Sequence, residues 1–322
     1  MSLYRILFFS ILFLSLGCSS SDDSSSNGAL DVRYKVLFSY DGDVVFIGDQ
    51  SNEVIKKIYS QNSILGILGY YNNENTNEIF FITRNDFSNN VTLNKINLSE
   101  LFSSEEYYYT PQQSIITFNE NEDLISEIYF ESESRFHAIF GLSDYNAVLK
   151  TFENGSEVLE RNITANFGMD RYGIEFSTFF EDDTLILMES VFNSSLKRIK
   201  LVDLNSFTLI SENTNFSFNF FQGFGNSTGK YIIGRKIINY ETHEYLANIQ
   251  GNILYDITDG YSFLGHSSIG YDEADNAFEY FDRGDGRNET GVINTNNGEV
   301  TKTNIAGEPN FRSSPVFYFI PN

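Results

Sequence analysis

The sequence predicts an all-β fold, and three observations support this prediction. The 322 residues include 31 Phe and 20 Tyr but only 4 Pro, a composition that favours strands joined by turns. Short apolar runs alternate with turns rich in Asn, Asp, Gly and Ser after the N-terminal segment. These runs also recur at a nearly constant interval, and no long segment carries apolar residues at helical spacing.

The interval is measured between the centres of the most apolar runs. Ile139, Ile186, Ile232 and Phe278 are separated by 47, 46 and 46 residues. A strand-built repeat of about 40 to 50 residues is typical of the blades of a β-propeller. About 290 residues divided by about 46 predicts six blades, with seven possible.

The first part of the chain fits this period more loosely. Its apolar centres, Val45 and Phe80, leave gaps of 35 residues between them and 59 residues before Ile139. A β-sandwich, or two sandwich domains, is therefore the alternative fold, because strand spacing alone does not exclude it.

Individual strands can be read from the apolar runs and the turns between them. An Asp-Gly turn after residue 40 is typical of a hairpin. The expected strands are 36–40, 44–47, 53–59, 78–83, 91–98, 136–142, 147–152 and 157–163. At the C-terminus, Ser313–Pro321 reads as a single apolar strand bordered by prolines. We expect it to pair with Tyr34–Tyr40 and so close a circular array of sheets.

Three segments resemble pieces of known propellers. Asn226–Gly234 resembles the turn and inner strand of TolB-like propellers, in which Gly-Lys leads into an aromatic-aliphatic strand. Leu196–Ile210 and Gly291–Ile305 resemble the outer hairpins of quinoprotein-like and YVTN-type blades. The resemblance covers about a quarter of the chain and implies the same fold as the period does.

Residues 1–18 indicate a lipoprotein signal. Arg5 precedes the apolar run Ile6–Leu16, which is shorter than the about 20 helical residues needed to span a membrane. Gly17 is followed by Cys18, the only cysteine in the sequence. The segment resembles the signals of bacterial lipoproteins, which implies that Cys18 is lipidated and anchors the chain in a membrane. An ordinary secretory signal with a stray cysteine is the alternative.

Residues 19–28 are polar and small, and we expect them to be a flexible tether ahead of a single propeller domain at 29–322. The acidic pair Asp22-Asp23 resembles the export signal of Bacteroidota lipoproteins. This resemblance implies an outer membrane lipoprotein exposed at the cell surface, with a periplasm-facing lipoprotein as the alternative.

The net charge excludes one class of partner. Without Arg5, 20 basic residues face 44 acidic ones, which gives 20 − 44 = −24 for the mature chain. Such a field repels a phosphate backbone, so nucleic acid is not an expected partner.

The densest polar stretch, Tyr271–Thr290, offers a candidate cation site. Carboxylate and amide oxygens are the ligands that Ca²⁺ takes, although the spacing here matches no EF-hand. The candidate ligands are Asp272, Asp275, Asp282, Asp285, Asn288 and Glu289. The alternative is two solvated acidic loops flanking the strand Ala277–Phe281. The Arg283–Asp285 tripeptide within this stretch carries no functional weight.

Signals for catalysis are sparse, so the sequence does not settle whether the protein is an enzyme. Gly223–Lys230 lacks both the spacing and the following Ser or Thr of a P-loop. His137 is expected inside a strand, His243 exposed in a turn, and His266 at the end of a strand. Tyr107–Tyr109 could form a sugar-binding platform, but rim residues are the simpler interpretation, and the chain has no Trp.

Three functions remain open at this point. The first is a binding or scaffold module that presents loops to a protein or glycan partner. The second is a hydrolase or lyase that acts on an extracellular polymer through carboxylates at the propeller centre. The third is a structural subunit of an envelope complex.

Overall fold

The computed structural model describes most of the chain after the predicted tether. The described residues are 34–39, 44–49, 51–58, 64–73, 75–85, 90–104, 111–117, 122–126, 128–180, 183–190, 197–216, 218, 220–224, 231–261, 266–272, 275–282, 288–307 and 315–319. All of them belong to the unit Val32–Asn322. The predicted signal, Cys18 and the tether lie outside the described residues. No helix in the described part of the chain is both long enough and apolar enough to cross a membrane.

The prediction of an all-β fold is confirmed. The strands of the first half are β1 (Tyr34–Ser39), β2 (Val44–Gly48), β3 (Val54–Ile58), β4 (Ile64–Asn73), β5 (Glu78–Asn85), β6 (Asn90–Asn97), β7 (Pro111–Thr117), β8 (Glu122–Leu124), β9 (Tyr129–Ser132), β10 (Arg135–Leu142), β11 (Ala147–Glu153) and β12 (Ser156–Asn162). Those of the second half are β13 (Ile174–Phe180), β14 (Thr184–Ser190), β15 (Lys197–Asp203), β16 (Thr208–Phe216), β17 (Phe220–Phe224), β18 (Tyr231–Ile238), β19 (Glu241–Asn248), β20 (Ile253–Asp256), β21 (His266–Asp272), β22 (Ala277–Asp282), β23 (Glu289–Asn294), β24 (Val300–Asn304) and β25 (Pro315–Phe319).

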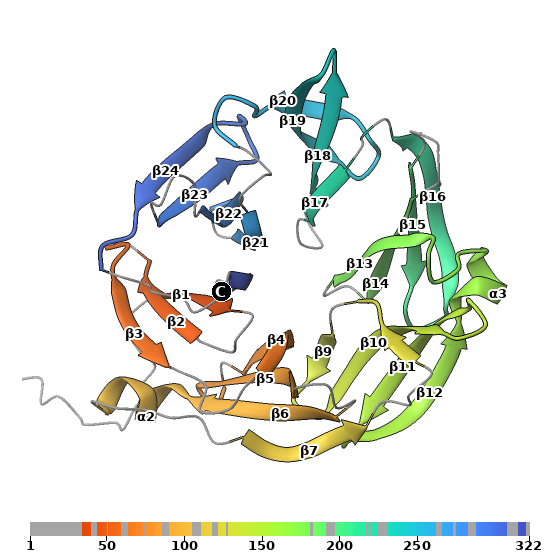
Figure 1. The fold of residues 1–322 in the computed structure, drawn as a ribbon, viewed down its shortest axis with the longest axis horizontal. Coiled ribbons are helices and arrows are strands. Elements are labelled where there is room, and N and C mark those ends of the chain that lie inside the picture. The colour runs from red at the N-terminus through yellow and green to blue at the C-terminus, as the bar shows by residue number, and fades with distance from the viewer. Residues whose placement is uncertain are drawn as a thin grey trace, which may run out of the picture. The chain divides into compact units, whose positions relative to one another are not determined.

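Within the described residues the strands form six antiparallel sheets. The first sheet has the order β25-β1-β2-β3, and the second has the order β4-β5-β6-β7. The third contains β8 to β12, with β8 and β9 both paired to β10. The fourth, fifth and sixth sheets are β13 to β16, β17 to β20 and β21 to β24. Figure 1 shows the sheets one after another around a centre, each with its first strand innermost, which is the arrangement of propeller blades.

The repeat period has a structural explanation. Ile139, Ile186, Ile232 and Phe278 lie on β10, β14, β18 and β22, the second strand of their sheets, and all four are fully buried. A second strand is covered on both faces by neighbouring sheets, so it reads as a continuous apolar run. Outer strands such as β12 are largely exposed and give no such signal.

The two irregular gaps also have causes in the fold. Val45 lies on β2, the third strand of its sheet, so its distance to the centre of β5 is short. The gap of 59 residues contains a helix, α2 (Leu98–Ser103), and the inner strand of the third sheet, which is divided into β8 and β9.

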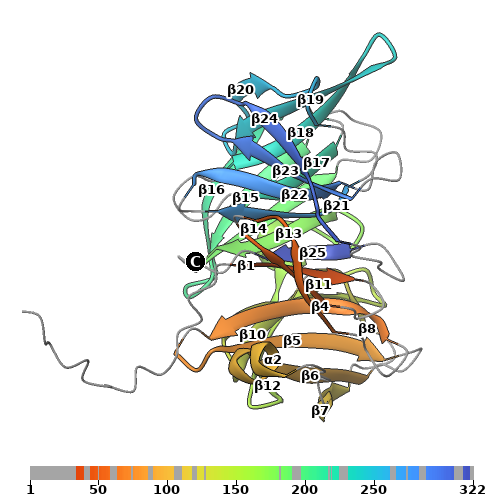
Figure 2. The same cartoon turned by 90° about the vertical axis from the view of Figure 1, so that its left-hand side faces the viewer.

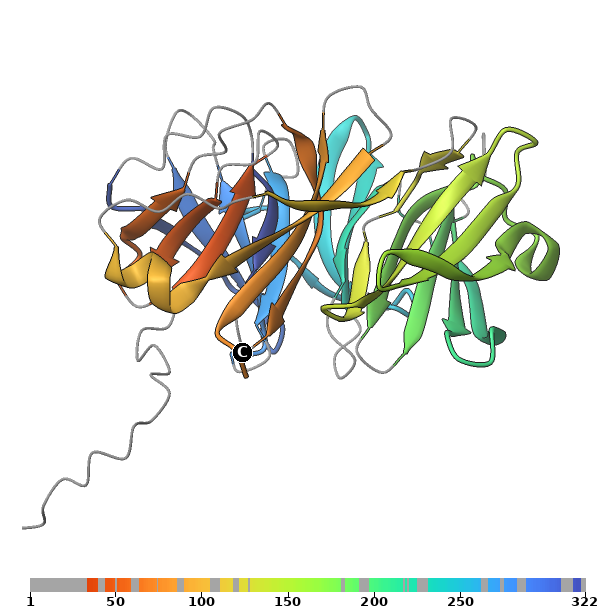
Figure 3. The same ribbon diagram turned by 90° about the horizontal axis from the view of Figure 1, so that it is seen from below.

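Two helices in the described part of the chain replace the ends of predicted strands. The expected strand ends at residues 98 and 163 are helical instead, in α2 and in α3 (Ile163–Phe167). Asn97 accepts a hydrogen bond from the backbone N–H of Glu100, and Asn162 accepts one from that of Ala165. These side chains cap the first turns, so the chain leaves the strand at the asparagine. Figure 3 shows both helices at the periphery, α2 in gold and α3 in green.

The hydrophobic cores lie between successive sheets. Five clusters of buried residues each join two sheets that follow one another in the chain or, in one case, the sixth sheet and the first. That last cluster packs Leu37 and Val45 against Phe281 and Ile305. The first and second sheets meet through Phe102 of α2, which contacts the rings of Tyr34 and Phe46.

The C-terminal strand adds a backbone connection to the N-terminus. β25 pairs antiparallel with β1, and Val36, Leu37 and Phe38 face Phe319, Tyr318 and Phe317. The first sheet is therefore built from both ends of the described chain, and Figure 2 shows β25 beside β1.

Candidate functional site

The structure divides the predicted cation ligands between the two ends of β22. Asp272 is buried at the end of β21 and accepts a hydrogen bond from the backbone N–H of Asp275, which lies in the next turn. Asp282, Asn288 and Glu289 lie at the other end of the strand. A strand of 6 residues is about 17 Å long, so one ion cannot contact both groups.

The predicted cation site is not tested by the described residues. Asp285 lies outside the described residues. Among the residues that the structure describes, no three His, Cys, Asp or Glu side chains are arranged to hold a metal ion.

The histidines have structural surroundings that differ in part from expectation. His137 is buried in β10, as predicted. His243 was expected in a turn but lies on β19, opposite Lys236, because the chain reverses at Asn239 and Tyr240 instead. His266 begins β21 rather than ending a strand. The predicted tyrosine platform at 107–109 and the tripeptide at 283–285 lie outside the described residues.

His137 is fully hydrogen-bonded. Its Nδ1 lies 2.9 Å from the Thr151 hydroxyl, and its Nε2 lies 2.7 Å from a carboxylate oxygen of Glu131. A carboxylate only accepts, so Nε2–H donates to Glu131 and Nδ1 accepts from Thr151 in the neutral ring. Burial lowers the pKa of His137, although Glu131 opposes this effect. The ring is part of the fold and not a free base.

Lys150 is a second buried polar group of the third sheet. Its Nζ lies 2.9 Å from both Glu122 and Glu157 and 3.3 Å from Glu160. Burial alone would lower the pKa of this amine, but the two hydrogen-bonded carboxylates outweigh burial and raise it. Lys150 therefore stays protonated and ties β11 to β8 and β12.

The described surface feature with the clearest binding chemistry is a pair of exposed tyrosines. Tyr145 is 60% exposed and Tyr172 is 68% exposed, although both are large and partly apolar. Their ring centroids are 5.6 Å apart, with an angle of 44° between the planes. The Arg171 guanidinium lies 5.2 Å from the Tyr172 ring centroid, within the range of a cation–π contact. We call Tyr145, Arg171 and Tyr172 the tyrosine edge.

Two tight turns hold these tyrosines in place. Asp144 accepts hydrogen bonds from the backbone and side-chain amides of Asn146, which fixes the β10–β11 turn around Tyr145. Asp170 accepts hydrogen bonds from the backbone N–H groups of Tyr172 and of the following glycine. Tyr145 has a φ of 71°, a conformation that costs a bulky residue about 1 to 2 kcal/mol.

Arg171 connects the two turns. Its backbone N–H donates to the carbonyl of Tyr145 at 3.0 Å, and its side chain donates to the carbonyl of Leu142 and to Asp123. A Cβ at Gly141 would lie 2.9 Å from the Cβ of Arg171, so this strand position leaves room for the arginine only as glycine. The tyrosine edge is thus presented on a braced support.

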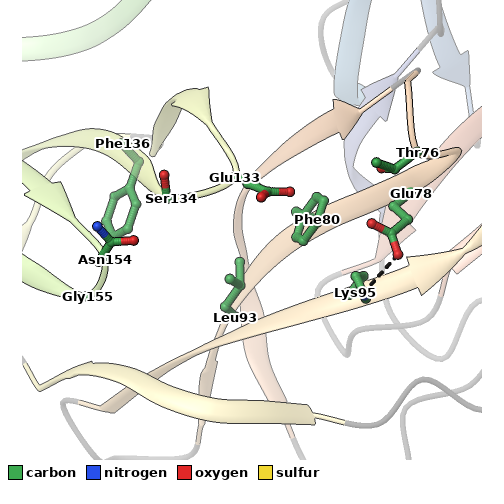
Figure 4. Close-up of a pocket in the computed structure, with 10 residues that line it drawn as sticks. All are labelled: Thr76, Glu78, Phe80, Leu93, Lys95, Glu133, Ser134, Phe136, Asn154 and Gly155. Carbon is green, nitrogen blue, oxygen red and sulfur yellow. Dashed lines mark ion pairs between the residues drawn. The ribbon is translucent and has the colours of Figure 1, made fainter.

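A groove lies at the opposite end of the β10–β11 hairpin, between the second and third sheets. It has a volume of about 480 Å³. Figure 4 shows Phe136 and Asn154 on one side, Phe80 in the middle and the ion pair of Glu78 with Lys95 on the other side. Its lining residues are Thr76, Glu78, Phe80, Leu93, Lys95, Glu133, Ser134, Phe136, Asn154 and Gly155.

Sequence reasoning identified neither of these two features. The predicted strands 136–142 and 147–152 leave a turn at residues 143–146, and an aromatic residue in a tight turn is a signal of exposure. However, Tyr145 and Tyr172 are 27 residues apart, and the chain passes through β11, β12 and α3 before it returns beside Tyr145. The groove is lined by separate short segments between residues 76 and 155, so no local sequence motif predicts it.

Comparisons with known proteins gave structural likenesses only. No family model and no curated protein matches the chain. Kuenenia stuttgartiensis hydrazine synthase is similar over 83% of this chain and 79% of its own, with 11% identity and a TM-score of 0.48. The β-propeller domain of Myceliophteria thermophila Cps50 (Swd1) is similar over 86% and 84%, with 9% identity and a TM-score of 0.42. The Dos1 propeller covers 88% of this chain and 70% of its own, with 11% identity and a TM-score of 0.44.

Proposed function

We propose that this protein is a lipid-anchored binding module of the bacterial outer membrane, built as a closed propeller of six blades, that holds a protein partner at the cell surface. Six sheets within the described residues, cores between successive sheets and the pairing of β25 with β1 support the closed six-bladed ring. The resemblance of residues 1–18 to lipoprotein signals supports the anchor at Cys18.

The observation that carries the binding function is the tyrosine edge. Tyr and Arg dominate the few residues that supply most of the affinity in protein interfaces. Here two exposed tyrosines and an arginine lie together on braced turns, so their presentation to a partner needs little further ordering. The Arg171 guanidinium beside the Tyr172 ring adds a second residue type that protein interfaces enrich, so the arrangement favours a protein over a glycan.

The topology is compatible with a partner on the far side from the membrane. Tyr34 begins β1 and Tyr145 follows the end of β10, and both strands are second in their sheets. Because equivalent strands of the ring run in the same direction, the anchored end of the chain joins at the edge opposite the tyrosines. A flexible tether of 10 residues has a typical span of about 17 Å, which leaves this outer edge accessible.

Site-specific photo-crosslinking in intact cells tests this function. A photoreactive phenylalanine analogue at Tyr172 is expected to give one discrete protein adduct, because this ring lies at the centre of the proposed contact. The adduct should become at least about fivefold weaker when Tyr145 is replaced by alanine, since a contact of about 1 kcal/mol or more is lost. The yields are compared by immunoblotting for this chain.

Leu209 supplies the control position, because it is 45% exposed on the outer strand β16, away from the tyrosine edge. The same adduct from positions 172 and 209 would reflect crowding at the surface and would contradict the proposal. Binding of a soluble glycan that depends on Tyr172, without any protein adduct, would replace the protein partner by a sugar.

A further inference from the structure

The groove between the second and third sheets has an apolar floor. Phe80 on β5 and Phe136 on β10 are 6% and 3% exposed, and Leu93 on β6 is half-buried. Phe80 and Leu93 belong to the second sheet and Phe136 to the third, so the floor exists only where these two sheets meet. Its volume of about 480 Å³ is that of a small-ligand pocket and exceeds the space that one long side chain needs.

The charges above this floor are predominantly negative. Glu78 and Glu133 contribute two carboxylates, and Lys95 contributes one ammonium group. Lys95 pairs with Glu78 at 2.8 Å, so that pair is internally balanced. Glu133 is exposed and accepts a hydrogen bond from Asn73 Nδ2 at 3.5 Å. Among the described residues no cation pairs with Glu133, and Figure 4 shows its carboxylate on the side of Phe80.

One half of the groove already holds a cation, which is a side chain of the protein itself. The Lys95 ammonium is held by Glu78 and lies 6.0 Å from the centroid of the Phe80 ring. A carboxylate together with an aromatic ring and a floor for the methylene stem is the environment that a lysine or arginine side chain prefers. The other half, with Glu133, Phe136 and Leu93, offers the same elements without the cation.

The turns that border this half are rigid. Asn154 and Gly155 have φ values of 50° and 78°, which is the two-residue hairpin turn with both residues left-handed. The backbone N–H of Asn154 also donates to the carbonyl of Ser134 at 2.8 Å, which joins this turn to the turn that carries Glu133. The carboxylate is therefore offered from a fixed backbone.

We propose that this groove binds a lysine or arginine side chain from a peptide segment of a partner, with the methylene stem on Phe80, Leu93 and Phe136 and the cation on Glu133. Charge complementarity selects this occupant, because the groove lacks a cation beside Glu133 and the whole chain has a formal charge of −23. The groove lies at the opposite end of β10 from the tyrosine edge, about 20 Å away, so it is a second site that does not depend on the first.

Fluorescence anisotropy with three labelled heptapeptides tests the proposal on the purified full-length protein. The peptides share the sequence Gly-Ser-Leu-X-Leu-Ser-Gly, in which X is lysine, norleucine or glutamate. We expect the lysine peptide to bind about three- to tenfold more tightly than the norleucine peptide, since one charge-assisted hydrogen bond is added at a partly exposed site. Glu133→Gln should remove this difference, and Glu133→Lys should make the glutamate peptide the better ligand.

Glu241→Gln is the matched control. Glu241 is exposed at the start of β19, so this substitution removes the same charge far from the groove. Equal weakening by Glu133→Gln and Glu241→Gln would show attraction by the net charge alone and would overturn the proposal. Equal affinity of the unchanged protein for the lysine and norleucine peptides would also overturn it. An unchanged unfolding temperature of Glu133→Gln identifies a loss of binding as local.

Discussion

At the scale of single residues, His137 couples the stability of the third sheet to pH. The ring is 3% exposed, and this burial favours the neutral form over the charged one. Burial lowers its pKa below the ordinary value of 6.5, and the charge of Arg135 acts in the same direction. The unfolded chain therefore takes up a proton at a pH where the folded protein does not.

This difference predicts a loss of stability as the pH falls below about 6.5. The stabilisation is present above the unfolded-state pKa and is lost as the pH decreases toward the folded-state pKa. His137→Gln keeps one donor and one acceptor but cannot titrate, so its urea midpoint should fall less between pH 7.5 and pH 5.5. Urea unfolding followed by circular dichroism at both pH values measures the difference.

The control for this experiment is His243→Gln, which removes a half-buried histidine on β19. It replaces one histidine without touching the contacts of His137 with Glu131 and Thr151, so it shows what a histidine replacement elsewhere in the fold does to the urea midpoint. If the urea midpoint of His137→Gln falls as much between pH 7.5 and pH 5.5 as that of the unchanged protein, His137 does not contribute to the pH dependence of stability.

At the scale of elements, the sequence predicts strands well where burial is two-sided. The predicted strand 136–142 is readable because β10 is covered on both faces, and the same holds for β14, β18 and β22. The ends of β6 and β12 are not readable, because a capping asparagine decides there between strand and helix. The tyrosine edge escapes prediction for a different reason, since Tyr145 and Tyr172 meet only through the path of the chain after α3.

The turn between β2 and β3 shows how one side chain joins two sheets. Asn52 has a φ of 51° and is 7% exposed. Its Nδ2 donates to the carbonyls of Thr303 and Asn304, and its Oδ1 accepts from the hydroxyl of Thr290 at 2.9 Å. The first sheet thereby holds the last two strands of the sixth.

Asn52→Ala should lower the free energy of unfolding by about 2 to 3 kcal/mol, because one buried and two partly buried hydrogen bonds are lost and alanine disfavours the left-handed backbone. Asn52→Gly loses the same hydrogen bonds but fits the backbone, so it should be about 1 kcal/mol more stable than the alanine variant. Urea titrations of the three chains give these values. Two variants of equal stability would mean that the backbone conformation is not strained at this position.

At the scale of the whole molecule, the proposed closed ring depends on the contacts between the first and sixth sheets. Besides the contacts of Asn52, Lys35 on β1 lies 2.6 Å from Glu279 on β22, and both side chains are almost fully buried. Lys35 Nζ also lies 3.3 Å from Asp49 at the end of β2, so this ammonium group links β22 to two strands of the first sheet. Backbone, side-chain and apolar contacts therefore converge where the two ends of the chain meet.

A chain that ends at residue 312 lacks β25 and tests whether this meeting point closes the ring. Four backbone pairs with β1 are lost, at about 1 kcal/mol each, and this is a large part of the usual 5 to 15 kcal/mol of total stability. We expect a lower urea midpoint and fast hydrogen exchange in β1, β2 and β22, whereas β10 and β14 exchange later because their own sheets are complete. A chain that ends at residue 320 keeps β25 and should match the full-length protein. Protected β1 amides in the shorter chain would mean that the first sheet is stable without its C-terminal strand. The pairing of β25 with β1 would then contribute little to the stability of the protein.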